Sequence, residues 1–282
     1  MIQAIPGQVP ESHTTIFFLQ TQKQSDSSKQ KMAKNKLAKF AEMETLDNVF
    51  QPLHKEVFRS DYALKGQWKQ KVFHNEHPVI LEVGCGKGEY TVGLGQLYPE
   101  KNFIGMDIKG ARIWHGAKAA QNDNLPNVAF LRMYAEMLES AFAPEEVSEI
   151  WITFPDPQMA KAKKRLTGTR FLNLYQKILK KDGIIHLKTD SPFLYAYTSE
   201  LIKINNLKEL VNTEDLYDGG LNDKILGIKT FYEQQWLSRG KKIKYIQFML
   251  NPAEPLIEPD VEIERDDYHS ETRFMNTQRQ EA

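Results

Sequence analysis

The clearest chemical signal in the chain is a glycine-rich segment, residues 82–88 (EVGCGKG). Glycines let a backbone turn tightly and approach a ligand closely, and here they stand at Gly84, Gly86 and Gly88. The spacing differs from the G-x-G-x-x-G of dinucleotide-binding enzymes, because the third glycine comes one residue early. The carboxylate of Glu82 would repel a pyrophosphate and suits an ammonium group. The segment therefore predicts a ligand that carries a cation.

A second carboxylate, Asp107, closes the apolar run 102–106. In doubly wound nucleotide folds an acid about 20 residues beyond the glycine turn binds ribose hydroxyls. Together with Glu82, this pattern describes a ligand with an amino-acid cation at one end and a ribose at the other. S-adenosylmethionine has that structure. The alternative is a generic strand–turn–helix loop with surface acids, which the register of all three features disfavours.

A third carboxylate, Asp156, stands between Pro155 and Pro157. Taken alone, Pro-Asp-Pro is also good turn chemistry, so an ordinary turn acid is the alternative. Basic residues follow it directly, and a run of charge is usually a solvated face. Their position beside the predicted site favours phosphate contacts to a polyanion instead. This cluster comprises Lys161, Lys163, Lys164, Arg165 and Arg170, and a second basic group comprises Lys34, Lys36 and Lys39. Arg165 could also anchor the helix that follows.

The elements that must position these residues follow from the apolar runs. Strands and helices alternate, which predicts an α/β, Rossmann-like fold with a mostly parallel seven-stranded sheet and helices on both faces. Loops at the carboxyl edge of such a sheet hold the ligands. The expected strands are 79–83, 102–107, 128–131, 149–154 and 183–188, and the expected helices are 90–98, 109–121 and 168–180.

Composition divides the 282 residues into four parts. Residues 1–31 are polar and aperiodic and are expected to be a disordered extension, with Met32 as a plausible start. Residues 32–77 form a basic N-terminal segment, and 78–250 form the predicted catalytic domain. Residues 251–282 are acidic and are expected to be a disordered tail.

The bulk numbers exclude several classes. Lys+Arg and Asp+Glu both number 37, so a wholly basic nucleic-acid binder is excluded, although a local basic face is not. The single cysteine, Cys85, allows no intrachain disulfide and favours a reducing cytoplasm. No apolar run approaches the roughly 20 residues that span a bilayer, and no signal peptide is expected. The histidines show no metal-ligand spacing, so no metal is predicted.

Five short motifs occur in a fixed order along the chain. They are residues 81–88 (LEVGCGKG), Phe154-Pro155-Asp156-Pro157, Lys163-Lys164-Arg165, Lys188-Thr189-Asp190 and Thr230-x-x-Glu233. In this order they resemble the bacterial tRNA (guanine-N7)-methyltransferase family, over about residues 32–250. Many methyltransferases share the glycine loop, whereas Pro-Asp-Pro, Thr-Asp and Thr-x-x-Glu together are specific to this family.

The resemblance implies a class I S-adenosylmethionine-dependent methyltransferase. Its partner would be tRNA, its product 7-methylguanosine at position 46 of the variable loop, and its state a monomer or homodimer. Cofactor contacts are implied at Glu82, Gly84, Gly86, Gly88, Asp107, Tyr134 and Asp156, with Asp156 as the catalytic residue. Substrate contacts are implied at Lys161, Asp190, Thr230 and Glu233, and we expect RNA-backbone contacts at Lys163, Lys164 and Arg165.

The sequence departs from the family pattern at three places. Gln158 replaces a tryptophan after Pro-Asp-Pro, and Ala160 takes the place of a lysine, with Lys161 one residue later. Tyr134 falls where the family often has an acid or amide near the end of the third strand.

Guanine recognition needs hydrogen-bond acceptors, because the base presents N1–H and an amino group on its Watson–Crick edge. Asp190 and Glu233 supply carboxylates, although Thr230 and Glu233 also read as a helix capping box. Two other functions stay open. One is methylation of a small molecule or protein side chain, which the basic cluster and the Asp190/Glu233 pair disfavour. The other is a non-catalytic RNA-binding protein, which would not bind S-adenosylmethionine.

Overall fold

A computed structural model describes residues 37–218 and 226–266 of the chain. The chain divides into two compact units, residues 1–45 and residues 46–282. Within the described part of the first unit, residues 37–43 are helical. The expected N-terminal extension, residues 1–31, lies outside the described residues, as do residues 267–282 of the expected tail.

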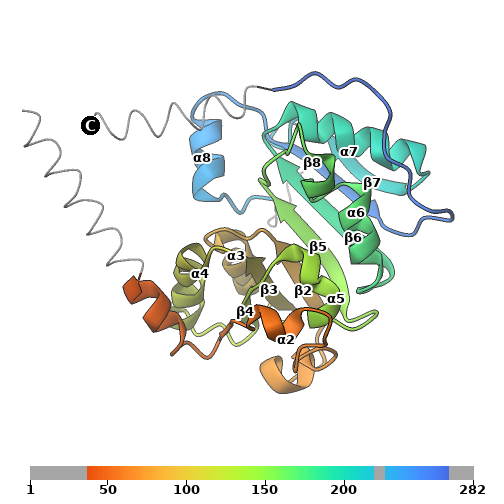
Figure 1. Cartoon of the computed structure of the whole chain (residues 1–282). Coiled ribbons are helices and arrows are strands. Elements are labelled where there is room, and N and C mark those ends of the chain that lie inside the picture. The colour runs from red at the N-terminus through yellow and green to blue at the C-terminus, as the bar shows by residue number, and fades with distance from the viewer. Residues whose placement is uncertain (1–36, 219–225, 267–282) are drawn as a thin grey trace, which may run out of the picture. The chain divides into compact units, whose positions relative to one another are not determined.

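The second unit is built on one eight-stranded sheet with the order β1-β4-β3-β2-β5-β6-β8-β7 (Figure 1). Among the strands of the described residues, only β8 runs antiparallel to its neighbours, β6 and β7, so the expected mostly parallel sheet is confirmed. The strands are β1 Val49–Phe50, β2 Val79–Val83, β3 Asn102–Asp107, β4 Val128–Arg132, β5 Val147–Thr153, β6 Leu179–Thr189, β7 Lys208–Thr213 and β8 Lys244–Met249.

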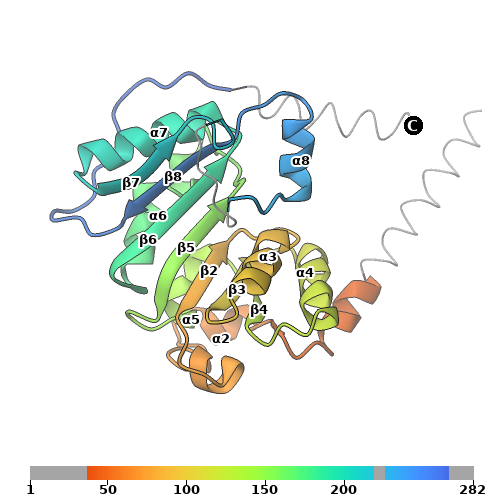
Figure 2. The same ribbon diagram turned by 180° about the vertical axis from the view of Figure 1, so that it is seen from behind.

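Helices cover both faces of the sheet, as the alternation of elements predicts. Figures 1 and 2 show α3 and α4 on one face and α5, α6 and α7 on the other. Contacts of α3 with β3, of α4 with β4 and of α7 with β8 join the layers. The helices are α2 His54–Val57, α3 Glu89–Leu97, α4 Gly110–Asn122, α5 Leu138–Ala141, α6 Thr169–Gln176, α7 Pro192–Ile204 and α8 Phe231–Leu237. None of the described helices is long and apolar enough to cross a membrane.

The sheet has one strand more than the seven predicted, because the N-terminal segment contributes an edge strand. Val49 and Phe50 of β1 pair with β4. Trp68 then packs under the sheet with no exposed surface, and its indole nitrogen donates to the carbonyl of Ala141 at 2.9 Å. Residues 46–77 are thus part of the same hydrophobic core as residues 78–250.

The predicted helix 168–180 ends early, since α6 stops at Gln176 and β6 already begins at Leu179. The apolar positions of residues 177–182 fit either structure, and pairing of Leu179 with Val147 decides for the strand. Asp182 has a positive φ of 62°, and the register shifts before Ile184.

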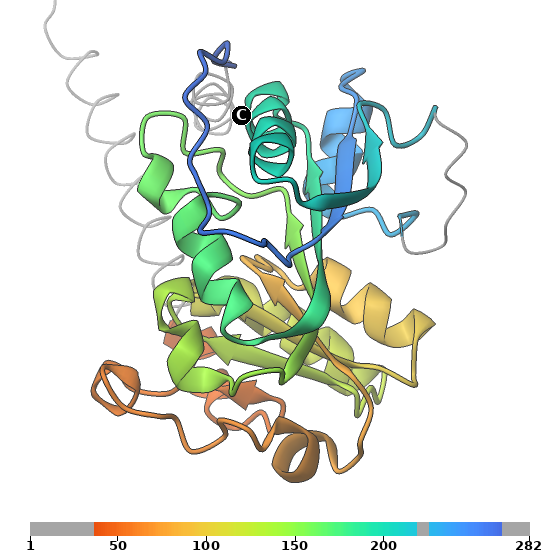
Figure 3. The same ribbon diagram turned by 90° about the vertical axis from the view of Figure 1, so that its right-hand side faces the viewer.

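Residues 251–266 differ from the expected disordered tail. The segment passes along α6 and α7, as Figure 3 shows for the dark blue coil. Glu258 accepts hydrogen bonds from Thr169 and from the hydroxyl of Tyr197, and the Ile257 amide donates to Asn205 at 2.7 Å. These contacts hold acidic residues in place, whereas their composition alone predicts a disordered, solvated tail.

The functional edge of the sheet lies where the strand order reverses, between β2 and β5. Parallel strands end on the same side, so the residues that follow β2, β3, β5 and β6 meet there. Those residues are the glycine loop, Asp107, Asp156 and Asp190.

Candidate active site

The glycine loop connects β2 to α3 through three left-handed backbone conformations. Gly84, Gly86 and Gly88 have φ values of 79°, 58° and 71°, which side chains adopt only with strain. A Cβ at Gly88 would lie 2.4 Å from the Phe130 ring, so this glycine packs α3 against β4. A Cβ at Gly86 would meet nothing within 4 Å. Gly86 therefore leaves its backbone open to a ligand, while Gly88 serves close packing.

Glu82 lies beneath this loop and is 2% exposed. Its carboxylate accepts from the amide and hydroxyl of Thr91 and from the hydroxyl of Thr153, so both oxygens are engaged. Burial raises the pKa of Glu82 to about 7, against the opposing effect of these hydrogen bonds. The geometry makes Glu82 a support that joins α3 to β5 under the loop, and any contact with a cofactor cation stays a proposal.

The raised pKa of Glu82 predicts a pH-dependent stability. A carboxyl group whose folded pKa of about 7 exceeds its usual 4.5 contributes stability that is complete below pH 4.5 and is lost as the pH rises through 7. Relative to Glu82→Gln, the wild-type free energy of unfolding should fall by about 3 kcal/mol over that window. Glutamine keeps the size of the side chain, and its amide can donate to Thr153. Urea denaturation of both proteins at several pH values measures the difference, and parallel pH profiles would contradict it.

Asp107 is the last residue of β3, and its carboxylate binds the backbone of the glycine loop. One carboxylate oxygen accepts from the Gly86 amide at 3.0 Å and the other from the Lys109 amide at 2.8 Å. This arrangement fixes the loop next to the carboxylate that is expected to hold a ribose. Tyr134 lies two residues beyond the end of β4 and is 53% exposed. Glycine loop, Asp107 and Tyr134 thus lie along neighbouring strand ends and fit an elongated cofactor with a nucleoside end.

The Pro-Asp-Pro loop follows β5 at the same edge. Pro155 and Pro157 are buried, whereas Asp156 is exposed. Phe154 and Gln158 bracket the loop with positive φ values of 49° and 48°. Such conformations cost free energy in residues with a side chain, and they collect at functional sites. The loop therefore presents the Asp156 carboxylate to solvent on a strained, proline-stiffened backbone.

Arg165 holds this loop from below and is only 4% exposed. Its guanidinium donates to the carbonyls of Pro157 and Gln158 at 3.1 and 3.2 Å and stacks 3.9 Å from the ring centre of Tyr197. The prediction that Arg165 contacts RNA phosphates does not fit this position, because its charge is used on backbone carbonyls and aromatic rings. The alternative reading, an anchor for the segment before α6, fits the structure.

The other members of the basic cluster face solvent. Lys161, Lys163 and Lys164 are exposed on a short 3-10 turn, Ala162–Lys164, beside the Pro-Asp-Pro loop. Arg170 lies close to Glu136, at 3.9 Å, on the first turn of α6. Lys163 and Lys164 are thus accessible to solvent, and their contact with phosphates stays a prediction. Lys161 stands nearest to Asp156 along the chain.

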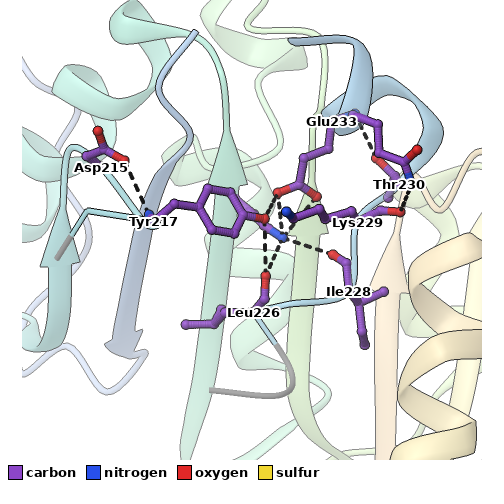
Figure 4. Close-up of polar contacts among 9 residues, drawn as sticks. Asp215, Tyr217, Leu226, Ile228, Lys229, Thr230 and Glu233 are labelled. Atoms are coloured by element: carbon purple, nitrogen blue, oxygen red, sulfur yellow. Dashed lines mark hydrogen bonds and ion pairs between the residues drawn. The ribbon is translucent and has the colours of Figure 1, made fainter. Parts of the chain in front are cut away.

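A buried ion pair joins α8 to β6. Lys188, with no exposed surface, places its ammonium 2.8 and 3.0 Å from the two carboxylate oxygens of Glu233. The same ammonium donates to the carbonyls of Leu226 and Ile228 at 3.0 and 3.1 Å. The hydroxyl of Tyr217 donates to Glu233 from the other side (Figure 4). Desolvation lowers the pKa of Lys188, and the charge of Glu233 opposes that shift.

This ion pair changes what Glu233 can do. Glu233 has no exposed surface, and its carboxylate is already shared by Lys188 and Tyr217. The prediction that Glu233 accepts hydrogen bonds from guanine therefore does not fit the structure, which uses it to hold α8. Thr230 is the N-cap of α8, and its hydroxyl accepts from the Glu233 amide at 3.2 Å. Half of a capping box is thus present, because the glutamate side chain turns to Lys188 instead.

Asp190 directly follows β6 and is 4% exposed. Its charge acts on Lys244, the first residue of β8, across the edge of the sheet. Unlike Glu233, Asp190 lines a cavity, together with Lys241, Lys242 and Lys244. Asp156 and Asp190 end the neighbouring strands β5 and β6.

Comparison with known proteins decides the family. Residues 76–246 match a family model described as a putative methyltransferase. A tRNA (guanine-N(7)-)-methyltransferase of Bacteroides thetaiotaomicron is 55% identical over 242 residues, which are 86% of this chain and 96% of that protein. The protein of the same name from Porphyromonas gingivalis is 56% identical, over 84% of this chain and 98% of that one. The chain belongs to the tRNA (guanine-N(7)-)-methyltransferase family.

The fold of this tRNA (guanine-N(7)-)-methyltransferase family member also occurs in an RNA methyltransferase of known structure. The 16S rRNA methyltransferase KamB matches with a TM-score of 0.51 and 14% identity, over 65% of this chain and 92% of that one. This likeness concerns the fold alone. The residue that sequence reasoning missed is Lys188, whose burial on a central strand gave no signal beyond its place before Thr189-Asp190. Within the described ranges, no three His, Cys, Asp or Glu side chains gather as a metal site.

Proposed function

We propose that this protein transfers a methyl group from S-adenosylmethionine to N7 of guanine in tRNA, forming 7-methylguanosine. The observation that carries the proposal is identity above one half with tRNA (guanine-N(7)-)-methyltransferases over nearly their whole length. We further propose guanine 46 of the variable loop as the target and the cytoplasm as the place of action.

The residues at the carboxyl edge fit S-adenosylmethionine. Gly86 leaves an open backbone position, and Asp107 lies beside it with a carboxylate suited to ribose hydroxyls. Gly84, Gly88, Glu82, Tyr134 and Asp156 complete the proposed cofactor set, with Glu82 acting from beneath the loop. When bound, the cofactor supplies a methyl group already activated on a sulfonium.

The protein's own part is alignment rather than proton removal. Guanine N7 carries a lone pair and no proton at neutral pH, so no strong general base is needed. Positioning of reacting groups supplies the main rate effect in such a reaction. Asp156 lies exposed on its stiff loop, where a fixed negative charge favours positive charge that develops on the purine. We assign Asp156 as the catalytic residue on this ground.

Guanine selection falls mainly to Asp190. Its carboxylate can accept from both N1–H and the amino group, whereas adenine presents an acceptor at N1. A protein that binds this edge leaves N7 on the opposite side of the base, toward the cofactor. Lys161 and Thr230 remain proposed substrate contacts on the loops to either side. A base in a loop is easier to extrude than one in a duplex, which favours a variable-loop guanosine.

The exposed lysines next to Asp156 predict a change in the salt dependence of tRNA binding. Each phosphate contact contributes a slope of about −0.7 to −0.9 to the logarithmic salt dependence. Lys163→Gln/Lys164→Gln should therefore flatten the slope by about 1.5 and lower the affinity for all tRNAs to a similar extent. Lys180→Gln/Lys181→Gln, with the same charge change at the far end of β6, is the control. Equal salt slopes in the two double variants would show that Lys163 and Lys164 make no phosphate contacts and belong to an ordinary solvated face.

Mapping of methylated nucleosides tests the function directly. Purified protein, S-adenosylmethionine and unmodified tRNA should give 7-methylguanosine at one site, which mass spectrometry of nuclease fragments locates. Methylation of a protein or metabolite in place of tRNA would support the alternative methyltransferase reading. Absence of S-adenosylmethionine binding in calorimetry would support a non-catalytic RNA-binding protein instead.

A further inference from the structure

A second group of basic residues lies on the other side of Asp190, where β8 begins. We name Lys241, Lys242 and Lys244 the β8 lysine patch. Strand register fixes its position, because Lys244 of β8 pairs with Thr189, the residue that precedes Asp190. The antiparallel direction of β8 brings its first residue to the carboxyl edge of β6. The patch therefore borders the proposed substrate site, although it lies more than 70 residues beyond Lys164 in the chain.

The patch lines a cavity of about 550 Å³ that also includes Asp190. Lys242 keeps 64% of its side chain exposed and lies 3.3 Å from Asp215. Lys244 is half-buried, where desolvation lowers its pKa and the charges of Asp190, Glu214 and Asp215 oppose that shift. The remaining lining residues are Pro192, Glu264, Arg265 and Asp266.

In the order of the sheet, the segments that carry the two basic groups come on either side of the strand that Asp190 follows. Lys163 and Lys164 follow the end of β5, Asp190 ends β6, and Lys244 begins β8, in the sheet order β5-β6-β8. An extruded nucleotide keeps its phosphodiester links on both its 5′ and its 3′ side. Phosphate contacts fix the register of a nucleic acid without reading its sequence. Contacts on both flanks would hold the backbone on each side of one nucleotide.

We propose that the β8 lysine patch is a second binding surface for the sugar-phosphate backbone, across Asp190 from Lys163 and Lys164. This inference rests on the proposed function, since it takes RNA as the ligand. It assigns a role to residues that carry no motif and lie outside the first basic cluster. The first cluster holds the backbone on one side of the target nucleotide, and the patch holds it on the other.

Acidic residues from the C-terminal segment line the same cavity. Asp266 accepts from the hydroxyl of Ser191 and from the Phe193 amide at 3.4 Å, directly after Asp190. Glu264 lines the cavity next to it. These carboxylates reduce the positive potential of the patch and occupy the place that a phosphate would approach. Loss of their charge should therefore strengthen RNA binding, opposite in sign to loss of the lysines.

The experiment compares charge-matched variants by tRNA binding over a range of salt concentrations. Lys241→Gln/Lys242→Gln/Lys244→Gln should bind tRNA about 10- to 100-fold more weakly and flatten the salt slope by about 2. Lys180→Gln/Lys181→Gln/Lys208→Gln removes the same charge at the opposite edge, where β6 and β7 begin. That edge is roughly 20 Å away along the strands, which exceeds the Debye length of about 10 Å, so the control should change affinity less than twofold.

Two further variants complete the test. Glu264→Gln/Asp266→Asn should bind tRNA more tightly than the wild type, and Lys241→Gln/Lys242→Gln keeps the half-buried Lys244 in case the triple variant unfolds. Unchanged S-adenosylmethionine affinity shows that each variant is folded. Equal losses in the patch and control variants, or a wild-type salt slope in the patch variants, would overturn the proposal.

The outcomes separate this inference from the proposed function. If the wild type forms 7-methylguanosine and the patch variants bind tRNA as it does, only the patch assignment fails. If the wild type binds tRNA through the patch but methylates another base, the proposed function fails and the surface stands. If the wild type binds no tRNA, both fail.

Discussion

Lys188→Met should weaken the docking of α8 by about 3–5 kcal/mol, the usual cost of leaving one member of a buried ion pair without its partner. Glu233 would then lie with no exposed surface opposite an apolar side chain. The carbonyls of Leu226 and Ile228 would lose the same donor. Because single elements of a protein can open without global unfolding, native-state hydrogen exchange of the α8 amides is the suitable measurement.

A double variant isolates the charge pair in this prediction. Lys188→Met/Glu233→Met removes both charges, and replacement of a buried pair by apolar residues is often neutral or stabilising. The double variant should therefore recover most of the protection lost in Lys188→Met. A loss below about 1 kcal/mol in the single variant would contradict the buried pair, since that is the range of exposed pairs.

Asp190→Asn should lower the rate of methyl transfer to tRNA by about 10- to 150-fold, the equivalent of one charged hydrogen bond of 1.5–3 kcal/mol. Asparagine keeps the size of the side chain but replaces one acceptor by a donor, which meets the donors of guanine. Affinity for S-adenosylmethionine should hold, because the glycine loop and Asp107 lie on other strands. Single-turnover rates and calorimetry measure the two quantities separately.

The matched control for Asp190→Asn is Asp182→Asn. Asp182 is an exposed carboxylate on the same strand, near its opposite end, and accepts from Asn251 at 3.0 Å. This control should transfer methyl groups at the wild-type rate. If Asp190→Asn does so too, Asp190 does not select guanine, even if the enzymatic assignment survives.

Glu233 shows that a motif can be found in the sequence although the role of its residues cannot be predicted from it. Thr230-x-x-Glu233 is visible as letters, and the sequence pairs Glu233 with Asp190 as guanine acceptors. In the structure that carboxylate, on α8, pairs with Lys188, whose ammonium lies 2.8 Å away on β6. Sequence separation of 45 residues hides the pair, and only strand order and helix docking bring the two charges together.

Arg165 gives the same lesson with the opposite charge. In the sequence it is the third residue of the basic run Lys163-Lys164-Arg165, and either a phosphate contact or an anchor for the next helix fits it. In the structure it turns inward, against Tyr197 and the carbonyls of the Pro-Asp-Pro loop. The planar guanidinium can satisfy several acceptors and stack at once, which an ammonium cannot. Packing decides which member of a basic run is buried, so composition cannot reveal which one that is.

The sequence by itself determined the sheet, the glycine turn, the carboxylates at strand ends and the family. Those features are local, because continuous apolar runs, glycines in a turn and acids after a strand are all set by neighbours in the chain. Tertiary structure alone decided the eighth strand, the inward turn of Arg165, the Lys188–Glu233 pair and the approach of Lys244 to Asp190. Each of these depends on which distant segments share an edge or a face of the sheet. The free energy of a contact between two distant segments depends on both, so neither segment alone reveals it.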